Sequence, residues 1–335
     1  MSQLLDTVLL FALPASGKSE VRAYLDQLSS EQCETEMHIG KTLQLDDYPY
    51  VHLMHRIDDE LMKRGEDYIF YQGPNRPFKD PFTWDTLIRL INEDYADLMA
   101  NRTYDVPSAA QLLFDRLDNA RALVDLPRSL GEIPYRVRME IAEALEEECA
   151  AELKIKNDTC SQDLKGKTIV IEAARGAHNG AAYPLTPPYG YAYALSVLSQ
   201  EIIERASILY VWVTPEESRR KNIERGQPDG QGSILHHSVP MEVMLGQYGC
   251  DDMSYLIETS DKENTVKVER IVERVDQEGT TKYGLKQWNI PVARFDNRDD
   301  LTSFVRNKNW NPKDAELLHN GLKGALATLA QFSEK

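Results

Sequence analysis

A lysine and a hydroxyl group stand side by side just after a short apolar segment of the sequence. The segment from Thr7 to Leu13 leads into Pro14, three small residues and then Lys18 and Ser19. The backbone N–H groups of such a loop can surround phosphate oxygens, while the lysine reaches the outer phosphates and the serine binds Mg²⁺. This pattern predicts the following nucleotide-binding residues: Ala12, Pro14, Ala15, Ser16, Gly17, Lys18, Ser19 and Glu20.

The spacing of these residues fits the phosphate-loop pattern G-x-x-x-x-G-K-[ST] at every fixed position except the first, where Ala12 replaces glycine. A glycine there mainly allows a tight turn as the chain leaves the strand, so a methyl group is tolerated where φ is negative. Gly17 is retained where the backbone comes closest to phosphate. A helix follows, with Val21, Tyr24 and Leu25 spaced along one face.

Three carboxylates follow two further segments that read as strands. Asp46 and Asp47 come after the alternating segment "TLQL", and Glu172 ends an aliphatic run. Ligands gather at the carboxyl ends of strands in open α/β sheets, so these groups are expected to face the nucleotide. Glu172 needs a partner at the tip of a buried strand, and Mg²⁺ beside Ser19 is the natural candidate. For the aspartates, a solvated loop position or a helix cap is the alternative.

The stretch "ALPASGKSEV" resembles the phosphate loop of the P-loop NTPases, and within them that of the nucleoside and nucleotide kinases. The resemblance implies ATP or another nucleoside triphosphate, Mg²⁺ and a small-molecule acceptor. It also implies that an acidic residue near the end of the second strand serves as base for the acceptor hydroxyl. Asp46 is the first choice for this base and Asp47 the second. Glu172 matches a carboxylate of the group, and Arg175 matches its nearby arginine, displaced by two alanines.

A charged helix after the strand-like segment 206–214 resembles the lid of nucleotide kinases. The three cations that the resemblance assigns to stabilising the transferring phosphoryl group are Arg219, Arg220 and Arg225. They precede a loop rich in Gly, Pro and Asp. An ordinary charged helix face, with Arg220 paired to Glu224, is the alternative. By the same resemblance, Asp296 and Arg298 after the last strand are candidates for contact with the nucleotide base.

Five strand-like segments, each followed by helical sequence, predict the fold. They lie at residues 7–13, 42–45, 168–171, 206–214 and 290–296. Continuous apolar strands are typical of parallel sheets that are buried on both faces and therefore carry helices on both sides. The sequence predicts an α/β protein: a three-layer α/β/α sandwich with a five-stranded parallel sheet, like that of the P-loop kinases, plus a large helical insertion.

The chain is expected to divide into a core, an insertion and a final helix. The expected ranges are 1–50 and 160–310 for the P-loop kinase-like core, 51–159 for the insertion, and 311–335 for a C-terminal helix packed on the core. Helical periodicity marks 84–99, 109–124 and 134–155 within the insertion. The insertion could bind the acceptor or form an oligomerisation surface. A second insert, 266–283, is predicted to be a β-hairpin that turns at 276–279.

The composition narrows the range of partners and locations. The net charge of −16 and the absence of a long basic run disfavour nucleic acid as a partner. The apolar runs are too short to span a membrane. Four widely spaced cysteines read as reduced thiols, which favours a cytoplasmic protein. The expected partners are a nucleoside triphosphate and a small-molecule acceptor, with a homo-oligomer possible.

Taken together, these features predict an ATP- and Mg²⁺-dependent phosphotransferase, a kinase acting on a small acceptor such as a nucleoside or nucleotide. The alternative is a nucleotide-binding regulator or slow NTPase that acts through a protein partner. The aspartate pair and the arginine-rich helix favour the kinase, whereas the large insertion keeps the regulator open.

Overall fold

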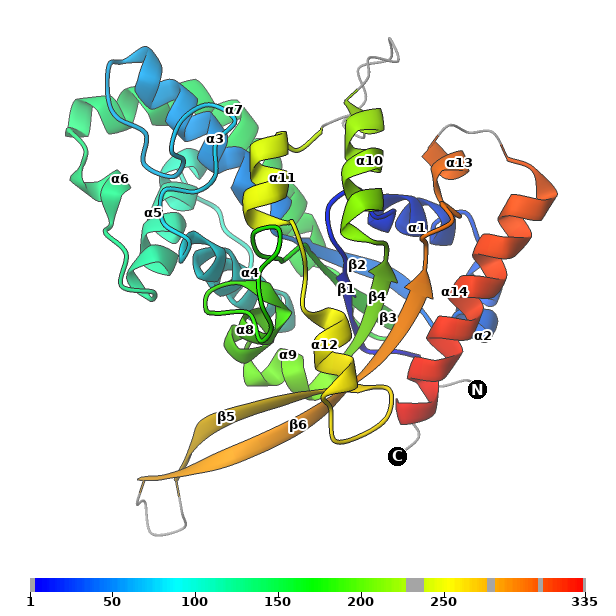
Figure 1. Ribbon diagram of the computed structural model, residues 1–335. Helices are drawn as coiled ribbons and strands as arrows, with labels where there is room; N and C mark the ends of the chain where they lie inside the picture. The colour runs from blue at the N-terminus through cyan, green and yellow to red at the C-terminus, as the bar shows by residue number, and fades with distance from the viewer. Residues whose placement is uncertain (1–3, 227–237, 276–280, 307–309, 334–335) are drawn as a thin grey trace.

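A mixed six-stranded sheet lies at the centre of the protein (Figure 1). The computed structural model describes residues 4–226, 238–275, 281–306 and 310–333. The strands lie in the order β2-β3-β1-β4-β6-β5. Their bounds are β1 Thr7–Phe11, β2 Lys41–Asp46, β3 Lys167–Ala173, β4 Ala206–Trp212, β5 Thr265–Val275 and β6 Thr281–Asp296.

The prediction of a purely parallel five-stranded sheet is wrong at one edge. β2, β3, β1, β4 and β6 pair in parallel, but β5 pairs antiparallel with β6. β6 is much longer than the segment expected from its apolar residues, and its early part, up to Pro291, pairs with β5, while Val292 to Asp296 pair with β4. The expected hairpin is present, and it adds its first strand to the central sheet. Its expected turn lies outside the described residues.

Helices connect the strands and cover the sheet. Their bounds are α1 Lys18–Leu25, α2 Ser30–Glu36, α3 Tyr48–Lys63, α4 Thr83–Met99, α5 Ala109–Ala122, α6 Ser129–Glu132, α7 Tyr135–Cys160, α8 Gly190–Val197, α9 Gln200–Arg205, α10 Pro215–Arg225, α11 Met241–Gln247, α12 Met253–Glu258, α13 Ser303–Arg306 and α14 Pro312–Ser333. The three helices expected in the insertion are present as α4, α5 and α7. None of the described helices has the length and apolar character needed to cross a membrane.

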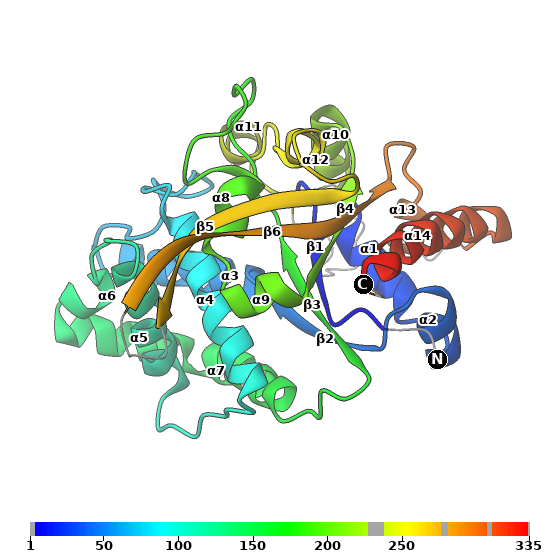
Figure 2. The ribbon, with the colours of Figure 1, turned by 90° about the horizontal axis from the view of Figure 1, so that it is seen from below.

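Alternate side chains of β1 enter two different cores because successive residues of a strand point to opposite faces. Leu9 and Phe11 pack with residues of α4, α8 and α9, whereas Val8 and Leu10 pack with residues of α1 and α14. Figure 2 shows α1 and α14 on one side of the sheet and α4 and α8 on the other. Both faces of the sheet are therefore covered by helices.

The helices α3 to α7 enclose a third apolar core of their own. It is centred on buried side chains such as Phe70, Phe114 and Leu117. α4 contributes to two cores, because Leu87 and Leu90 face this third core while Ile88 and Ile91 face the sheet. α4 thereby fixes the position of the helical segment beside the carboxyl ends of the strands.

Candidate functional site

The loop between β1 and α1 has a backbone shape that requires glycine at position 17. Gly17 has φ 102°, in the left-handed region. A Cβ atom there would lie 2.5 Å from Thr302 Oγ1 and 2.7 Å from Asn297 Nδ2. Ala12 is not among the described residues with positive φ, so its methyl group causes no backbone strain. The glycine retained in the sequence is the one that the structure needs.

The carbonyl groups of this loop are bonded by two side chains from distant parts of the chain. Ser218 Oγ, on α10, donates to Pro14 O at 2.7 Å, and Asn297 Nδ2 donates to Ser16 O at 2.7 Å. Both side chains are fully buried. These two bonds therefore restrain the loop and satisfy two of its carbonyl oxygens inside the protein.

The N-terminus of α1 provides backbone N–H donors. Its N-cap, Gly17, provides no side-chain cap. Among the described residues, no acceptor is found for the backbone N–H groups of residues 18 to 20. Free N–H groups and the helix dipole together favour an anion at such a position. The eight residues of α1 thus begin at a site suited to phosphate.

Lys18 lies at the same end of α1 with only weak contacts. The side chain is almost fully buried. Its Nζ lies 3.4 Å from Ala12 O and 4.0 Å from Glu172 Oε1. Burial lowers the pKa of Lys18, and the negative charge of Glu172 opposes that change. The ammonium group therefore has donors left for a phosphate group that would also compensate its burial.

Two of the predicted carboxylates end neighbouring strands at the same height. The parallel register of β2 and β3 pairs Asp46 with Glu172. Burial, followed by the charges of Glu172 and Asp47, raises the pKa of Asp46 to about 7. Asp46 accepts one hydrogen bond, from the N–H of Tyr48 at 2.9 Å, and so it also supports the first turn of α3. Glu172 accepts a hydrogen bond from Arg22 Nη1 at 2.6 Å.

Asp47 has a different environment. Its Oδ2 accepts a hydrogen bond from Arg175 Nη1 at 2.6 Å, and both side chains are buried. The Arg175 guanidinium lies 5.0 Å from the centre of the Trp84 ring, which holds it from the other side. Asp47 precedes α3 but makes no side-chain cap. Each aspartate therefore accepts one hydrogen bond, but among the described residues only Asp47 is ion-paired with an arginine.

One large cleft of about 1000 Å³ joins these groups. Pro14, Ala15, Ser16, Lys18 and Ser19 line one end of it, and the three carboxylates lie beside them. Aromatic side chains from the helical segment line the other end. The volume lies at the upper end of the range found for small-molecule sites.

Only one of the three arginines predicted on α10 reaches the cleft. Arg225 lines it and bonds Glu20 at 2.8 Å, so the two residues restrain each other beside the loop. Arg219 pairs with Glu216 on α10, and Arg220 pairs with Glu217 and Glu224 on α10 and, at 3.6 Å, with Asp300. Those two arginines thus have the helix-face arrangement that was the alternative. The glycine-rich loop, residues 227–237, lies outside the described residues.

Asp296 and Arg298 lie beyond the lining of the cleft. Arg298 bonds Asp296 at 2.7 Å, and its guanidinium stacks on Trp212 at 4.0 Å. Neither is among the described residues that line the cleft. The residue between them, Asn297, acts on the site by holding Ser16. Asn297 therefore stabilises the loop although its neighbours Asp296 and Arg298 do not line the cleft.

Several side chains of the cleft were not predicted from the sequence. Arg22 lies one helical turn after Lys18, and this spacing is a signal that could have revealed it. The aromatic residues come from separate segments with no common spacing: His55, Tyr71, Phe78, Trp84 and Tyr248. Only the folded chain brings them together.

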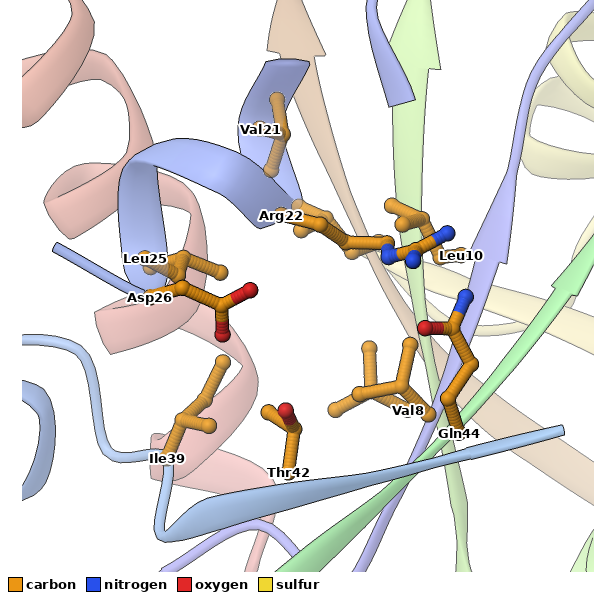
Figure 3. A pocket seen from close by; sticks show the side chains of 11 residues that line it. Val8, Leu10, Val21, Arg22, Leu25, Asp26, Ile39, Thr42 and Gln44 are labelled. Atoms are coloured by element: carbon orange, nitrogen blue, oxygen red, sulfur yellow. The ribbon is translucent and has the colours of Figure 1, made fainter. Parts of the chain in front are cut away.

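A second, much smaller cavity lies beneath α1 (Figure 3). Its volume is about 30 Å³, room for one or two water molecules. Val8, Leu10 and Leu25 supply much of its apolar lining, and Arg22 extends over it from α1. This cavity is too small to hold a substrate.

The donor set of the cleft suits Mg²⁺. Ser19, Asp46 and Glu172 line the same end, where burial, followed by the negative charges of Glu172 and Asp47, raises the pKa of Asp46. No group of three or more His, Cys, Asp and Glu side chains among the described residues forms a complete metal cage. Mg²⁺ usually retains water and binds one or two carboxylates together with substrate phosphates. The residues present therefore fit a magnesium ion that is held jointly with a nucleotide.

Comparisons of the chain with models of protein families, with curated proteins and with solved structures gave no match. The function must therefore be inferred from the cleft itself. Its relevant groups are the uncapped loop and helix end, the buried Lys18, and the carboxylates opposite them.

Proposed function

We propose that the protein is an ATP- and Mg²⁺-dependent phosphotransferase that acts on a hydroxyl group of a small acceptor. We propose with it that the sheet and its helices have the three-layer arrangement of the P-loop kinases. The strand order supports this. From β1 the chain continues to β2, toward one edge of the sheet. From β4 it continues to β5 and β6, toward the other edge. Ligands of open α/β sheets bind at such a reversal, and the loop with Lys18 lies there.

The observation that carries the proposal is the buried Lys18 at the start of an uncapped helix, opposite the carboxylates. In the proposed complex, Lys18 and the N–H groups of residues 15 to 20 hold the terminal phosphates of ATP. The phosphate charge replaces the weak contact of Lys18 with Glu172. Glu172 keeps its hydrogen bond from Arg22.

Ser19 and Glu172 would hold Mg²⁺, with Asp46 close by. When bound, the ion neutralises phosphate charge and orients the terminal phosphoryl group. Arg225 would exchange its bond with Glu20 for one to the phosphates and stabilise the charge that develops during transfer.

In the transfer step, the acceptor oxygen forms a bond to the terminal phosphorus of ATP. The bond between that phosphorus and the bridging oxygen breaks, and ADP leaves with the electron pair. The hydroxyl proton passes to Asp46, whose pKa is raised to about 7 and which, unlike Asp47, is not ion-paired with an arginine among the described residues. A base with a pKa near the working pH suits this role. We place the reaction in the cytoplasm, in keeping with four cysteines that form no disulfide.

The proposal is tested by the variant Lys18→Ala. Mg-ATP at one hundred times its Kd is expected to stabilise the wild type by about 2.7 kcal/mol, which is seen as a rise in Tm. This rise in Tm should be lost in the variant. The variant should stay folded and should lose ATP turnover. Lys41→Ala, at an exposed lysine of β2, is the control and should behave like the wild type.

An unchanged Mg-ATP shift in Lys18→Ala would overturn the proposal. Measuring ATP consumption with and without acceptors distinguishes the kinase from the regulator alternative. A kinase consumes ATP only when an acceptor is present, whereas consumption that no acceptor increases would favour a hydrolase or a regulator.

A further inference from the structure

The end of the cleft away from the phosphate loop is formed by a connected series of aromatic rings, here called the aromatic wall. The rings of His55 and Tyr71 stack with centroids 3.7 Å apart, and those of Tyr71 and Phe78 stack at 4.8 Å. Trp84 contacts Phe78 edge to face at 4.9 Å, and Tyr248 contacts Trp84 at 5.5 Å. All five line the cleft.

The aromatic wall is held in place by buried polar contacts. Asp58 accepts hydrogen bonds from the backbone N–H groups of Ile69, Phe70 and Tyr71 at 2.7 to 3.2 Å, which fixes the segment that carries Tyr71. Arg175 holds the face of Trp84 while it bonds Asp47. The aromatic wall is thereby connected to the carboxylates of the site.

The cations near the aromatic wall are already neutralised. Arg56 bonds Glu148 at 3.2 Å, and Arg76 bonds Glu242. His52 shares Glu148 with Arg56. Partial desolvation by the surrounding side chains lowers the pKa of His55 although part of its ring stays exposed, and the ring is therefore uncharged at neutral pH. Among the described residues, this end of the cleft thus offers an acceptor no cation without a carboxylate partner.

An anionic acceptor would fit this end poorly. A phosphate or carboxylate group there would lie near Asp47 and Asp59 and could bind Arg56 or Arg76 only by breaking that arginine's existing ion pair. A flat, uncharged ring fits well, because it can stack on aromatic side chains and displace water from them. His55 is exposed, so the face of its ring that Tyr71 does not cover is available for such stacking.

From this arrangement we infer that the acceptor is an uncharged alcohol that carries a flat ring. The ring lies against the aromatic wall and the hydroxyl group points toward Asp46. The inference rests on the proposed phosphotransferase function and names the class of its second substrate.

The test compares matched acceptors with Mg-ATP and the full chain. Nucleosides are each paired with their 5′-monophosphate, and glycerol is paired with glycerol 3-phosphate as a set without rings. We expect kcat/KM for at least one uncharged ring-bearing alcohol to exceed that of its monophosphate and of both glycerol compounds by tenfold or more. His55→Ala should raise the KM for this acceptor about tenfold and leave the Mg-ATP thermal shift unchanged. His178→Ala, at an exposed histidine outside the cleft, is the matched control.

Three results would overturn the inference while Mg-ATP still binds: a monophosphate preferred over its nucleoside, an acceptor without a ring preferred over all others, or no ring-bearing alcohol accepted. An unchanged acceptor KM in both His55→Ala and Tyr71→Leu would also overturn it. Loss of Mg-ATP binding in the wild type would instead overturn the proposed function, so the two failures are distinguishable.

Discussion

The side chains of Thr302 and Asn297 determine which residue can occupy position 17 of the loop. Gly17→Ala would place its new methyl group 2.5 Å from Thr302 Oγ1 and would hold alanine at φ 102°. Left-handed backbone costs about 1–2 kcal/mol and overpacking costs about 1–3 kcal/mol. We therefore expect the free energy of unfolding, measured in urea, to fall by about 2–5 kcal/mol.

Gly65→Ala is the control for this variant. Gly65 also has positive φ, 77°, but a Cβ atom there would have no neighbour within 4 Å among the described residues. It should show the backbone cost alone. Equal losses in the two variants would contradict the role assigned to Thr302 and Asn297.

The carboxyl of Asp46 should make stability depend on pH. Its raised pKa means that the folded state holds this proton more tightly than the unfolded state does, so the free energy of unfolding falls as pH rises from about 4 to about 7. Asp46→Asn removes this contribution. The variant should match the wild type near pH 4 and become more stable, by up to about 4 kcal/mol, near pH 8. Urea unfolding at both pH values checks this.

The same variant should lose phosphoryl transfer. A stability difference that is equal at pH 4 and pH 8 would show that Asp46 does not bind its proton more tightly in the folded state. Retained transfer would assign the base to another group, with Asp47 as the neighbouring candidate.

At the scale of elements, α10 supports the loop through one buried hydroxyl group, that of Ser218. Ser218→Ala removes the 2.7 Å donor to Pro14 O and leaves that carbonyl only the long contact from Ser16 Oγ at 3.5 Å. An unsatisfied buried acceptor costs about 1–3 kcal/mol. We expect a fall of that size in the free energy of unfolding, and weaker Mg-ATP binding because the loop loses one of its two restraints. Calorimetric titration measures the binding.

Ser196→Ala, on α8, is a suitable comparison, because the Ser196 hydroxyl bonds a carbonyl of its own helix far from the loop. It should leave the Mg-ATP affinity unchanged. Full affinity in Ser218→Ala would show that Asn297 alone suffices to shape the loop.

The sequence predicts those elements whose characteristic residues lie next to one another along the chain. The first strand, the loop with Lys18 and the following helix appear in order, and α4, α5 and α7 follow their apolar periodicity. β5 shows the limit. Its alternation predicts a strand, but alternation does not reveal which sheet a strand joins. Asp46 and Glu172 could be placed at strand ends, yet Ser218 and the aromatic wall depend on contacts between distant segments.

At the scale of the whole molecule, the cleft lies between two cores. The loop and the carboxylates belong to the sheet, whereas most of the aromatic wall belongs to the core of α3 to α7. α4 packs into both cores, and the Arg175 to Asp47 bond adds a second connection. The distance between the phosphate end and the acceptor end is therefore set by core packing. For a transfer between two bound molecules, such fixed placement accounts for much of the catalysis.

The bonds from Ser218 and Asn297 to the loop have one more consequence. They join Pro14 and Ser16 to residues 204 and 281 positions further along the chain. A peptide of residues 7–25 would contain every letter of the motif and neither of these restraints. Grafted alone onto a foreign scaffold, the segment would lose the curvature that exposes its amides. The proposed anion binding would therefore require the assembled chain and would not transfer with the short segment.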